Sequence, residues 1–463
     1  MKAVTMTRNF RRRPTNRVRR RAPMFSCCTG CCADDAEDRL EHTPRNSDDV
    51  GRPLLRMRWS RSNNGASSSG DEAKASLVLE GGMTFRMREG KEFGRYSLSH
   101  EVGRGAHCMV WRCVRLSKSG EPRVFALKVH TEETSAFKRE MAALKKFDGV
   151  SCGGGVELFP RFMGTVKVQG RTGIAMPLYG PDLYVLQKLR ERKPFPQSFV
   201  WAVASQLLGA LEALVHAGLV HADIKPQNVV LQDCSLVNVA ENNVNGHNNP
   251  DLDHETHVVL IDLGSCLTTE QLATNQSRIT YVQSRWYRAP EVLLWSPISH
   301  PADAWSVGCV IAEVAVGVPI VPGESEYNQL ARIYAMLGPP PPALLMRARR
   351  ADEFFESGED GAGPDGGGAL LREERAADEP PIVRYLPHDE LIDILENLVP
   401  HSSEAYRDAL IILLDGLLRW DPLERWSGGR LMQRLQASLE SQGVAWSNPA
   451  QGVVLRSASL ARI

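Results

Sequence analysis

The segment LVHADIKPQNVVL, residues 219–231, places three polar side chains between two apolar ends. Asp223, Lys225 and Asn228 occupy its middle, while an apolar pair precedes them and an apolar triplet follows. A buried strand has no use for such groups, because burying a polar group without a partner is costly. A purely solvated loop has no use for the apolar ends. The pattern therefore predicts a rigid loop that is anchored at both sides and presents its polar centre for chemistry.

Length and composition limit the number of domains, the size of the core and the compartment in which the chain can fold. The 463 residues suggest two to three domain-sized units, and a hydrophobic content of 43% supports a sizeable core. Six of the ten cysteines are scattered singly, which favours a reducing compartment over a disulfide framework. We expect no transmembrane segment, since the best apolar run, Val307 to Val321, is too short and contains a Glu and a Pro. We also expect no secretory signal peptide.

Residue composition and hydrophobic periodicity change several times along the chain. Residues 1–90 are rich in Arg, Ser, Asn and Asp without periodicity, so we expect a mostly disordered arm. Residues 96–116 fit two strands joined by a glycine turn, and residues 123–130 and 171–179 fit further strands. Between them, residues 135–147 place Phe137, Met141 and Leu144 at helical spacing. The part after Gly180 is dominated by apolar helical stripes.

These features predict an α+β fold with a small β-rich lobe and a larger α-rich lobe. Two polar or Pro/Gly-rich insertions in the second part are expected to be surface loops with little core. The expected boundaries are an arm at 1–90, a bilobal domain at 96–436 with lobes at 96–176 and 180–436, a hinge at 177–179, insertions at 232–256 and 339–380, and a tail at 437–463.

Several further motifs are weak when each is taken alone. The turn GRGAHCMV, residues 103–110, lets the backbone approach a phosphate, but it also fits an ordinary turn. Lys128 on a strand and Glu140 on the following helix fit surface charges, or a pair that leaves the lysine to hold phosphate oxygens. DLG at 262–264 is commonly an ordinary turn when taken alone. The order and separation of all these motifs, with Glu291 and Arg425 further on, make chance agreement very improbable.

Taken together, residues from about 96 to 435 resemble a eukaryotic protein kinase domain. The matching strings are GRGAHCMV for the glycine-rich loop, FALK for the strand lysine, HADIKPQN for the catalytic loop, DLG for the metal-binding triplet, APE for the end of the activation segment and DAWSVGC for the buried helix after it. The resemblance implies ATP and Mg²⁺ as cofactors and protein substrates with Ser or Thr hydroxyls.

The resemblance implies a role for each matched residue in phosphoryl transfer, where positioning and electrostatics carry the catalysis. Asp223 would accept or orient the substrate hydroxyl proton, and Lys225 would neutralise charge on the transferred group. Asp262 and Asn228 would bind metal. Glu291 and Arg425 would form a buried structural pair, and His221 would organise the loop. The ATP-binding residues implied are Val102, Gly103, Arg104, Gly105, Val110, Ala126, Lys128, Glu140, Met176, Pro177 and Tyr179.

Pro177 in the expected hinge lacks a backbone N–H. The family uses only the carbonyl at that place, and proline keeps its carbonyl. The donor that adenine needs falls at Tyr179, which retains its N–H. We therefore expect adenine binding to be intact.

The string YVQSRWYRAPEVLL, residues 281–294, resembles the CMGC group of kinases and, within it, the DYRK and HIPK kinases. Tyr281 matches a tyrosine that these kinases phosphorylate on themselves, and Arg285 and Arg288 would pair with the phosphate. Three positions depart from the family pattern. Cys108 replaces the third loop glycine, a feature shared with SRPK kinases, Ala222 replaces the usual Arg, and Leu263 replaces the commoner Phe.

The N-terminal arm leaves several interpretations open. Residues 1–33 carry one Lys and eight Arg without an acidic residue, which fits nuclear import, nucleic-acid binding, an organelle transit peptide or a solvated tail. The cluster CCTGCC at 27–32 fits zinc binding, palmitoylation or free thiols. We expect a cytoplasmic or nuclear protein. A pseudokinase scaffold, or a nucleic-acid- or membrane-binding protein acting through the arm, remains the alternative to an active kinase.

Overall fold

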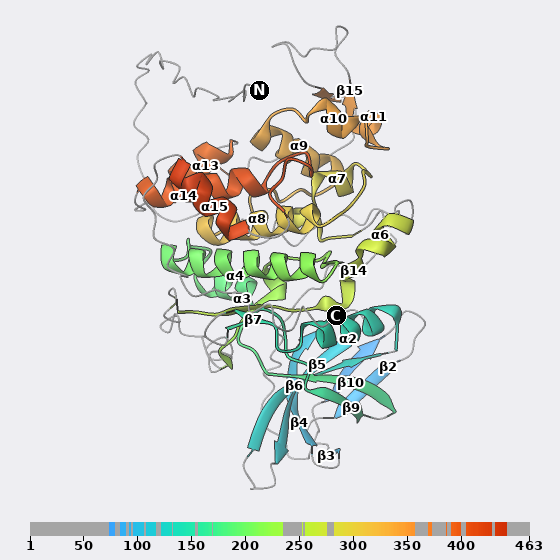
Figure 1. The fold of residues 1–463 in the computed structure, drawn as a ribbon. Helices are drawn as coiled ribbons and strands as arrows, with labels where there is room; N and C mark the ends of the chain where they lie inside the picture. Colours follow the sequence, from blue (N-terminus) through green and yellow to red (C-terminus); the bar gives the residue numbers. More distant parts are fainter. Residues whose placement is uncertain are drawn as a thin grey trace, which may run out of the picture. The chain divides into compact units, whose positions relative to one another are not determined.

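The structure is a computed structural model, and it describes the following residues: 74–78, 84–88, 92–93, 96–105, 108–116, 122–131, 133–152, 156–168, 170–234, 252, 255–275, 282–356, 369–372, 386, 390–399, 404–427 and 431–441. The expected α+β class is confirmed, with a β-rich first part and a helical second part (Figure 1). Two paired strands between residues 74 and 88 lie within the range expected for the disordered arm, and the last paragraph of this subsection describes them.

One antiparallel sheet of six strands forms the first part, in the order β3-β4-β5-β6-β10-β9. Its strands are β3 Glu92–Phe93, β4 Tyr96–Arg104, β5 Cys108–Leu116, β6 Pro122–His130, β9 Gly164–Val168 and β10 Arg171–Met176. The central strand β6 lies between β5 and β10, and its last six residues are buried. Lys128 therefore projects from the most constrained strand of the sheet.

Helix α2, Ser135–Phe147, crosses near this sheet and begins where the Thr134 side chain accepts a hydrogen bond from the Phe137 N–H at 3.3 Å. Its buried face consists of Phe137, Glu140, Ala143, Leu144 and Phe147. The expected stripe is therefore right at Phe137 and Leu144, whereas Met141 is only partly buried. The helix turns one carboxylate, that of Glu140, toward the protein interior.

Most of the apolar core lies among the helices of the second part, where α4 packs against α8 and α8 against α14 (Figure 1). The helices there are α3 Leu183–Leu189, α4 Gln197–His216, α6 Thr269–Asn275, α7 Pro290–Leu293, α8 Pro301–Val316, α9 Glu326–Leu337, α10 Pro342–Leu345, α11 Ala351–Phe354, α13 Leu391–Leu398, α14 Glu404–Leu417 and α15 Leu431–Ser441. By length and composition α4 could cross a membrane, a stronger candidate than the run considered above, but 83% of its apolar window is buried as in a core helix.

Two short antiparallel pairs hold the polar segment at 219–231. Strand β11, Leu219–Val220, pairs with β14, Leu267–Thr268, and β12, Val229–Leu231, pairs with β13, Val258–Leu260. The apolar ends of the segment are thus the two strands, and the polar residues lie on the loop between them. This confirms the expected loop anchored at both sides.

The structure corrects three expectations about the flanks. Within the expected arm, β1 Lys74–Val78 pairs with β2 Thr84–Arg88. The start of the second insertion is not a coreless loop, since α10, α11 and the pair β15 Phe355–Glu356 and β16 Leu370–Leu371 lie within it and Leu344 and Phe354 are buried. Helix α15 runs past the expected domain end at 436, because Leu439 is buried against the core. The cysteine cluster and Tyr281 lie outside the described residues.

Candidate active site

The sheet, helix α2 and the loop after β13 bring three charged side chains together. The Lys128 Nζ donates to Glu140 Oε1 at 2.6 Å and to Asp262 Oδ1 at 2.9 Å. Lys128 and Asp262 are 134 residues apart in sequence. Because Lys128 and Glu140 are almost fully buried while the Asp262 side chain is 42% exposed, the cluster opens to solvent on the aspartate side.

The charges in this cluster stabilise one another. Burial lowers the pKa of Lys128, but the facing carboxylates of Asp262 and Glu140 outweigh it, so that pKa lies well above the ordinary value. The Lys128 ammonium in turn lowers the pKa of Asp262 well below its usual range, against the effect of its partial burial. At neutral pH the cluster therefore presents an ionised carboxylate beside a fixed ammonium.

A second group of side chains surrounds Asp223 on the loop after β11. Lys225 Nζ donates to Asp223 Oδ2 at 2.9 Å, and Ser284 Oγ donates to Asp223 Oδ1 at 2.8 Å. Lys225 also donates to Ser284 Oγ at 3.1 Å. Asp223 is thereby held by both oxygens, so its carboxylate has a defined orientation. The sequence interpretation found Asp223 and Lys225 but missed Ser284, which is linked to them only in three dimensions.

Asp303 at the start of α8 fixes the backbone of this loop. Its carboxylate accepts from the His221 N–H at 2.6 Å and from the Ala222 N–H at 3.0 Å. His221 Nε2 lies 3.1 Å from the Ile261 carbonyl, beside Asp262. Ala222 has φ 63°, a left-handed conformation that a side chain makes costly, by about 1 kcal/mol or more. The helix thus holds a strained loop. Asp303 lies in the string DAWSVGC, but the sequence analysis gave this residue no role.

Asn228 lies next to Asp262 through the backbone, since the Ile261 N–H donates to the Asn228 carbonyl at 2.8 Å. Its Nδ2 donates to the Asp223 carbonyl at 2.7 Å, which leaves Oδ1 as the side-chain atom that can meet a cation. Carboxylate and amide oxygens suit Mg²⁺, which takes few protein ligands and completes its shell with water and phosphate oxygens. Asp262 and Asn228 fit that ion, and the described residues contain no cluster of three or more His, Cys, Asp or Glu that would form a larger metal cage.

The expected phosphate-binding turn joins β4 to β5. Gly103 pairs with Val110 and Arg104 with Met109, and the Arg104 guanidinium is held by Glu101 at 2.6 Å. The Gly105 N–H donates to the Cys108 carbonyl at 2.8 Å. Cys108 Sγ lies so close to Gly105 that an added Cβ there would meet it at 2.8 Å. The cysteine is therefore accommodated because Gly105 has no side chain.

The expected hinge follows β10. Met176 is buried and pairs with Ala126 on β6, so both lie at the end of the sheet from which Pro177 continues. Tyr179 donates its hydroxyl to Glu157 Oε2 at 2.7 Å, and burial raises the pKa of that hydroxyl. The side chain is thus fixed, and within the described part of the chain the Tyr179 N–H has no hydrogen-bond partner.

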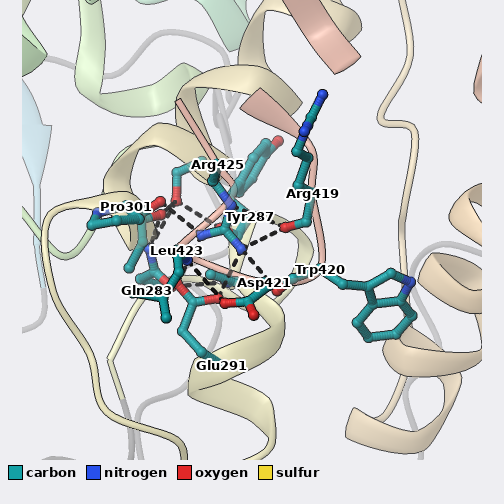
Figure 2. A network of polar contacts seen from close by, with 12 residues as sticks. Gln283, Tyr287, Glu291, Pro301, Arg419, Trp420, Asp421, Leu423 and Arg425 are labelled. Atoms are coloured by element: carbon teal, nitrogen blue, oxygen red, sulfur yellow. Dashed lines mark hydrogen bonds and ion pairs between the residues drawn. The ribbon is translucent and has the colours of Figure 1, made fainter. Parts of the chain in front are cut away.

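The pair expected between Glu291 and Arg425 forms in the core of the helical part, as Figure 2 shows. Arg425 donates to both carboxylate oxygens of Glu291, at 2.7 and 2.9 Å, and neither side chain is exposed. The guanidinium also donates to the carbonyls of Pro301 and Arg419. The pair connects α7, which carries Glu291, with the start of α8 and the loop after α14.

Arg285 and Arg288 have partners other than the one expected for them. Arg288 is buried, and its guanidinium donates to the carbonyls of Val282 and Gln283 and to Glu326 Oε1. Arg285 donates to the Glu324 carbonyl. Gln283 lies in the string YVQSRWYRAPEVLL, but the sequence analysis gave this residue no role. Its side chain bonds to Ala302 and Ser306 on α8 and to the Ala289 N–H.

Comparison with known proteins agrees with this geometry. A family model described as protein kinase domain matches residues 96–437. The serine/threonine-protein kinase ppk15 of Schizosaccharomyces pombe is 32% identical over 257 residues, covering 54% of this chain and 42% of that protein. Homeodomain-interacting protein kinase 1 of Caenorhabditis elegans is 30% identical over 245 residues, 53% of this chain and 26% of its own length.

The dual specificity protein kinase YAK1 of Saccharomyces cerevisiae is 27% identical over 356 residues, covering 73% of this chain and 41% of that protein. The chain thus spans less than half the length of these curated relatives. The family match covers most of the chain and includes every residue of the two charged clusters described above. The chain therefore belongs to the protein kinase domain family, with relatives among the HIPK, DYRK and YAK1 kinases of the CMGC group.

Proposed function

We propose that the chain is an ATP- and Mg²⁺-dependent protein kinase that phosphorylates Ser and Thr hydroxyls of protein substrates. The observation that carries the proposal is the cluster of Lys128, Glu140 and Asp262, in which one ammonium contacts two carboxylates from distant parts of the chain. An ammonium held in this way is positioned to bind phosphate oxygens, and an ionised aspartate beside it is a ligand for a divalent cation.

The chain's own residues divide the work between the two clusters. Lys128, held by Glu140, would bind the α- and β-phosphates, while Asp262 and Asn228 would hold Mg²⁺. Bound Mg²⁺ would neutralise charge on the phosphate oxygens. Asp223, oriented by Ser284 and Lys225, would accept the proton of the substrate hydroxyl, and Lys225 would stabilise charge on the transferred group.

Adenine recognition would use backbone groups after β10. The Pro177 carbonyl would accept from the base and the Tyr179 N–H would donate to it. Both groups belong to a segment that the buried Met176 and the Tyr179–Glu157 hydrogen bond hold in place. The remaining nucleotide contacts are proposed for residues on β4, β5 and β6 and on the turn after β4, namely Val102, Gly103, Arg104, Gly105, Val110 and Ala126.

Phosphate transfer from radiolabelled ATP to a degenerate Ser/Thr peptide library tests the proposal. Wild-type protein should label the library, while Asp262→Asn and Lys128→Met should lose at least about a hundredfold in rate, because each removes a charge that acts on the phosphates. The matched controls are Asp415→Asn and Lys167→Met, whose side chains are exposed. Equal labelling by all five proteins would refute the assignment.

For regulation, we propose that Tyr281 is phosphorylated by the kinase itself and that tyrosine is modified only there. The residues around Tyr281 support this proposal, and so do the names of two relatives, YAK1 and a DYRK kinase, which describe them as dual specificity kinases. Mass spectrometry of protein made in bacteria should find the phosphate, and Tyr281→Phe should lower activity. An unmodified tyrosine in a fully active enzyme would contradict this part of the proposal.

Two other functions stay open as alternatives. A pseudokinase scaffold is favoured only by Cys108 and Ala222, and it would show nucleotide-dependent thermal stabilisation without turnover. Nucleic-acid or membrane contact through the basic arm is compatible with kinase activity. A cytoplasmic or nuclear location remains the prediction.

A further inference from the structure

Strand β6 carries a second ionisable residue next to the active-site cluster, and none of the roles above uses it. His130 lies two residues after Lys128, so both side chains leave the strand on the same face. Both reach the same carboxylate on α2. We propose that His130 is a positioning residue that holds Glu140 in place for Lys128, an inference that rests on the proposed kinase function.

The two oxygens of Glu140 are divided between the two strand residues. Oε1 accepts from Lys128 Nζ at 2.6 Å, and Oε2 lies 3.0 Å from His130 Nε2. A carboxylate paired with an ammonium can only accept hydrogen bonds, so Nε2 must carry the hydrogen of this contact. Within the described part of the chain, Oε2 has no other hydrogen bond. The imidazole therefore supplies the second of the two anchors of one buried carboxylate.

The imidazole is held in turn by its packing. His130 is 6% exposed and Glu140 is 2% exposed. The imidazole meets the Phe137 ring edge-on, with 5.2 Å between the ring centroids. Phe137 precedes Glu140 by one helical turn, so His130 contacts α2 at two successive positions on its buried face. The ring has little freedom to leave the carboxylate without displacing the helix.

The neighbouring groups explain why a second anchor matters. Lys128 also contacts Asp262, and Cys108 lies opposite His130 across the β5–β6 pair. A Glu140 carboxylate held by one oxygen could rotate about its long side chain, and the buried Oε2 would then lack a partner, which is costly. Held by both oxygens, it keeps Lys128 in the orientation needed for phosphate without any bound nucleotide. His130 thus acts on phosphate binding through Glu140 and not by touching the substrate.

Amide hydrogen exchange of the nucleotide-free full chain tests the anchoring, and it does not depend on catalysis. His130→Leu keeps an apolar body but loses the donor, whereas His130→Gln places an amide donor at a similar reach. We expect exchange across α2 to quicken about tenfold in His130→Leu and to stay near wild type in His130→Gln, as for loss of one hydrogen bond to a charged group. Val129→Ala is the control, because Val129 is buried on the opposite face of the same strand. It should leave α2 exchange unchanged.

Kinetics then distinguish positioning from stability alone. His130→Leu should raise KM for ATP about tenfold with a smaller loss of kcat, His130→Gln should restore KM, and Val129→Ala should lower Tm without changing KM. In a Glu140→Ala background, His130→Leu should add no further change in α2 exchange, because the partner is already gone.

Two outcomes would overturn the inference. One is an equal effect of His130→Leu and Val129→Ala on α2 exchange, and the other is a folded His130→Gln protein that exchanges like His130→Leu. If wild-type protein transfers no phosphate, the proposed function fails, whereas the exchange results still decide whether His130 anchors Glu140.

Discussion

Arg425 and Glu291 illustrate, at the scale of single residues, how a buried charge depends on its partner. The bidentate contact excludes water from both groups, and the guanidinium is further satisfied by backbone carbonyls and lies over the Trp305 ring, 5.2 Å from its centroid. Such a pair adds little net stability compared with apolar residues, since both charges lose hydration. Removing one partner is different, because it leaves the other charge alone in the core.

We therefore predict that Glu291→Gln lowers the free energy of unfolding by about 3–5 kcal/mol. Urea denaturation followed by circular dichroism measures the change. The control is Asp415→Asn, which breaks an exposed ion pair with Arg419 and should cost less than about 1 kcal/mol. Equal costs for the two variants would contradict the buried-pair interpretation.

The buried carboxyl of Glu313 on α8 should make the stability of the protein depend on pH. Burial raises the pKa of its carboxyl to about 7, although it accepts a hydrogen bond from the Tyr287 hydroxyl at 2.7 Å. In the unfolded chain the carboxyl has its ordinary pKa of 4.5, so the folded protein binds more protons between pH 4.5 and pH 7. The free energy of unfolding should therefore fall as pH rises through that window.

Glu313→Gln removes this titration and keeps an acceptor for Tyr287. Between pH 5 and pH 8 the variant should lose about 2–3 kcal/mol less stability than wild type. Urea unfolding at each pH measures the difference, with the exposed Glu404→Gln as control. Parallel stability curves for wild type and Glu313→Gln would count against the buried acid.

At the scale of whole helices, the distance between α8 and α14 depends on the size of one residue at their contact. Helix α8 approaches α14 at Gly308, where an added Cβ would lie 2.8 Å from Leu418 Cδ2 and 3.1 Å from Leu417 Cβ. The glycine thus sets the separation of two core helices. Glycine is a poor helix former, so a glycine inside α8 needs a reason. The close approach of the two helices supplies it, because there is no room for a side chain.

Gly308→Ala should accordingly destabilise the protein by about 1–2 kcal/mol, even though alanine favours the helix by about 1 kcal/mol over glycine. Thermal unfolding monitors the change. Lys138→Ala at an exposed position of α2 is the control and should change stability by no more than about 0.5 kcal/mol. A more stable Gly308→Ala protein would show that the two helices can separate without cost.

At the scale of the whole molecule, both charged clusters lie within the kinase family match at residues 96–437. That range belongs to one compact unit, residues 61–463. The interpretations that concern nucleic acid or membranes depend on residues 1–60 instead. The two sets of functions should therefore be separable.

A protein lacking residues 1–60 should keep the phosphoryl-transfer rate of the full chain within about twofold, because no residue of either cluster is removed. Filter binding of RNA and co-sedimentation with anionic vesicles test the arm in parallel. If the arm makes these contacts, binding should disappear with the deletion. A strong loss of kinase activity would show that the arm contributes to catalysis.

Sequence patterns were enough to predict the main strands and helices and the residues that would do chemistry at the site. Strand and helix periodicity placed β4, β5, β6, α2 and α4, and motif order identified Lys128, Asp223 and Asp262. These signals are local, because a strand, a helix or a catalytic loop is recorded in neighbouring residues. The same local reasoning missed the helices at the start of the second insertion, since their few apolar residues are buried only against distant ones.

The contacts between side chains of the site depend on the packing of the whole chain. Ser284 reaches Asp223, Asp303 holds the loop at His221, and His130 meets Glu140. The matched strings contain Ser284 and Asp303 without indicating these contacts, and none of them contains His130. His130 and Glu140 are only 10 residues apart, but Ser284 and Asp303 are 61 and 82 residues from their partners. All three contacts form only when strands and helices pack, and packing depends on the whole core and not on any one segment. Composition and spacing therefore identify the groups that do chemistry, whereas the fold selects the groups that hold them in position.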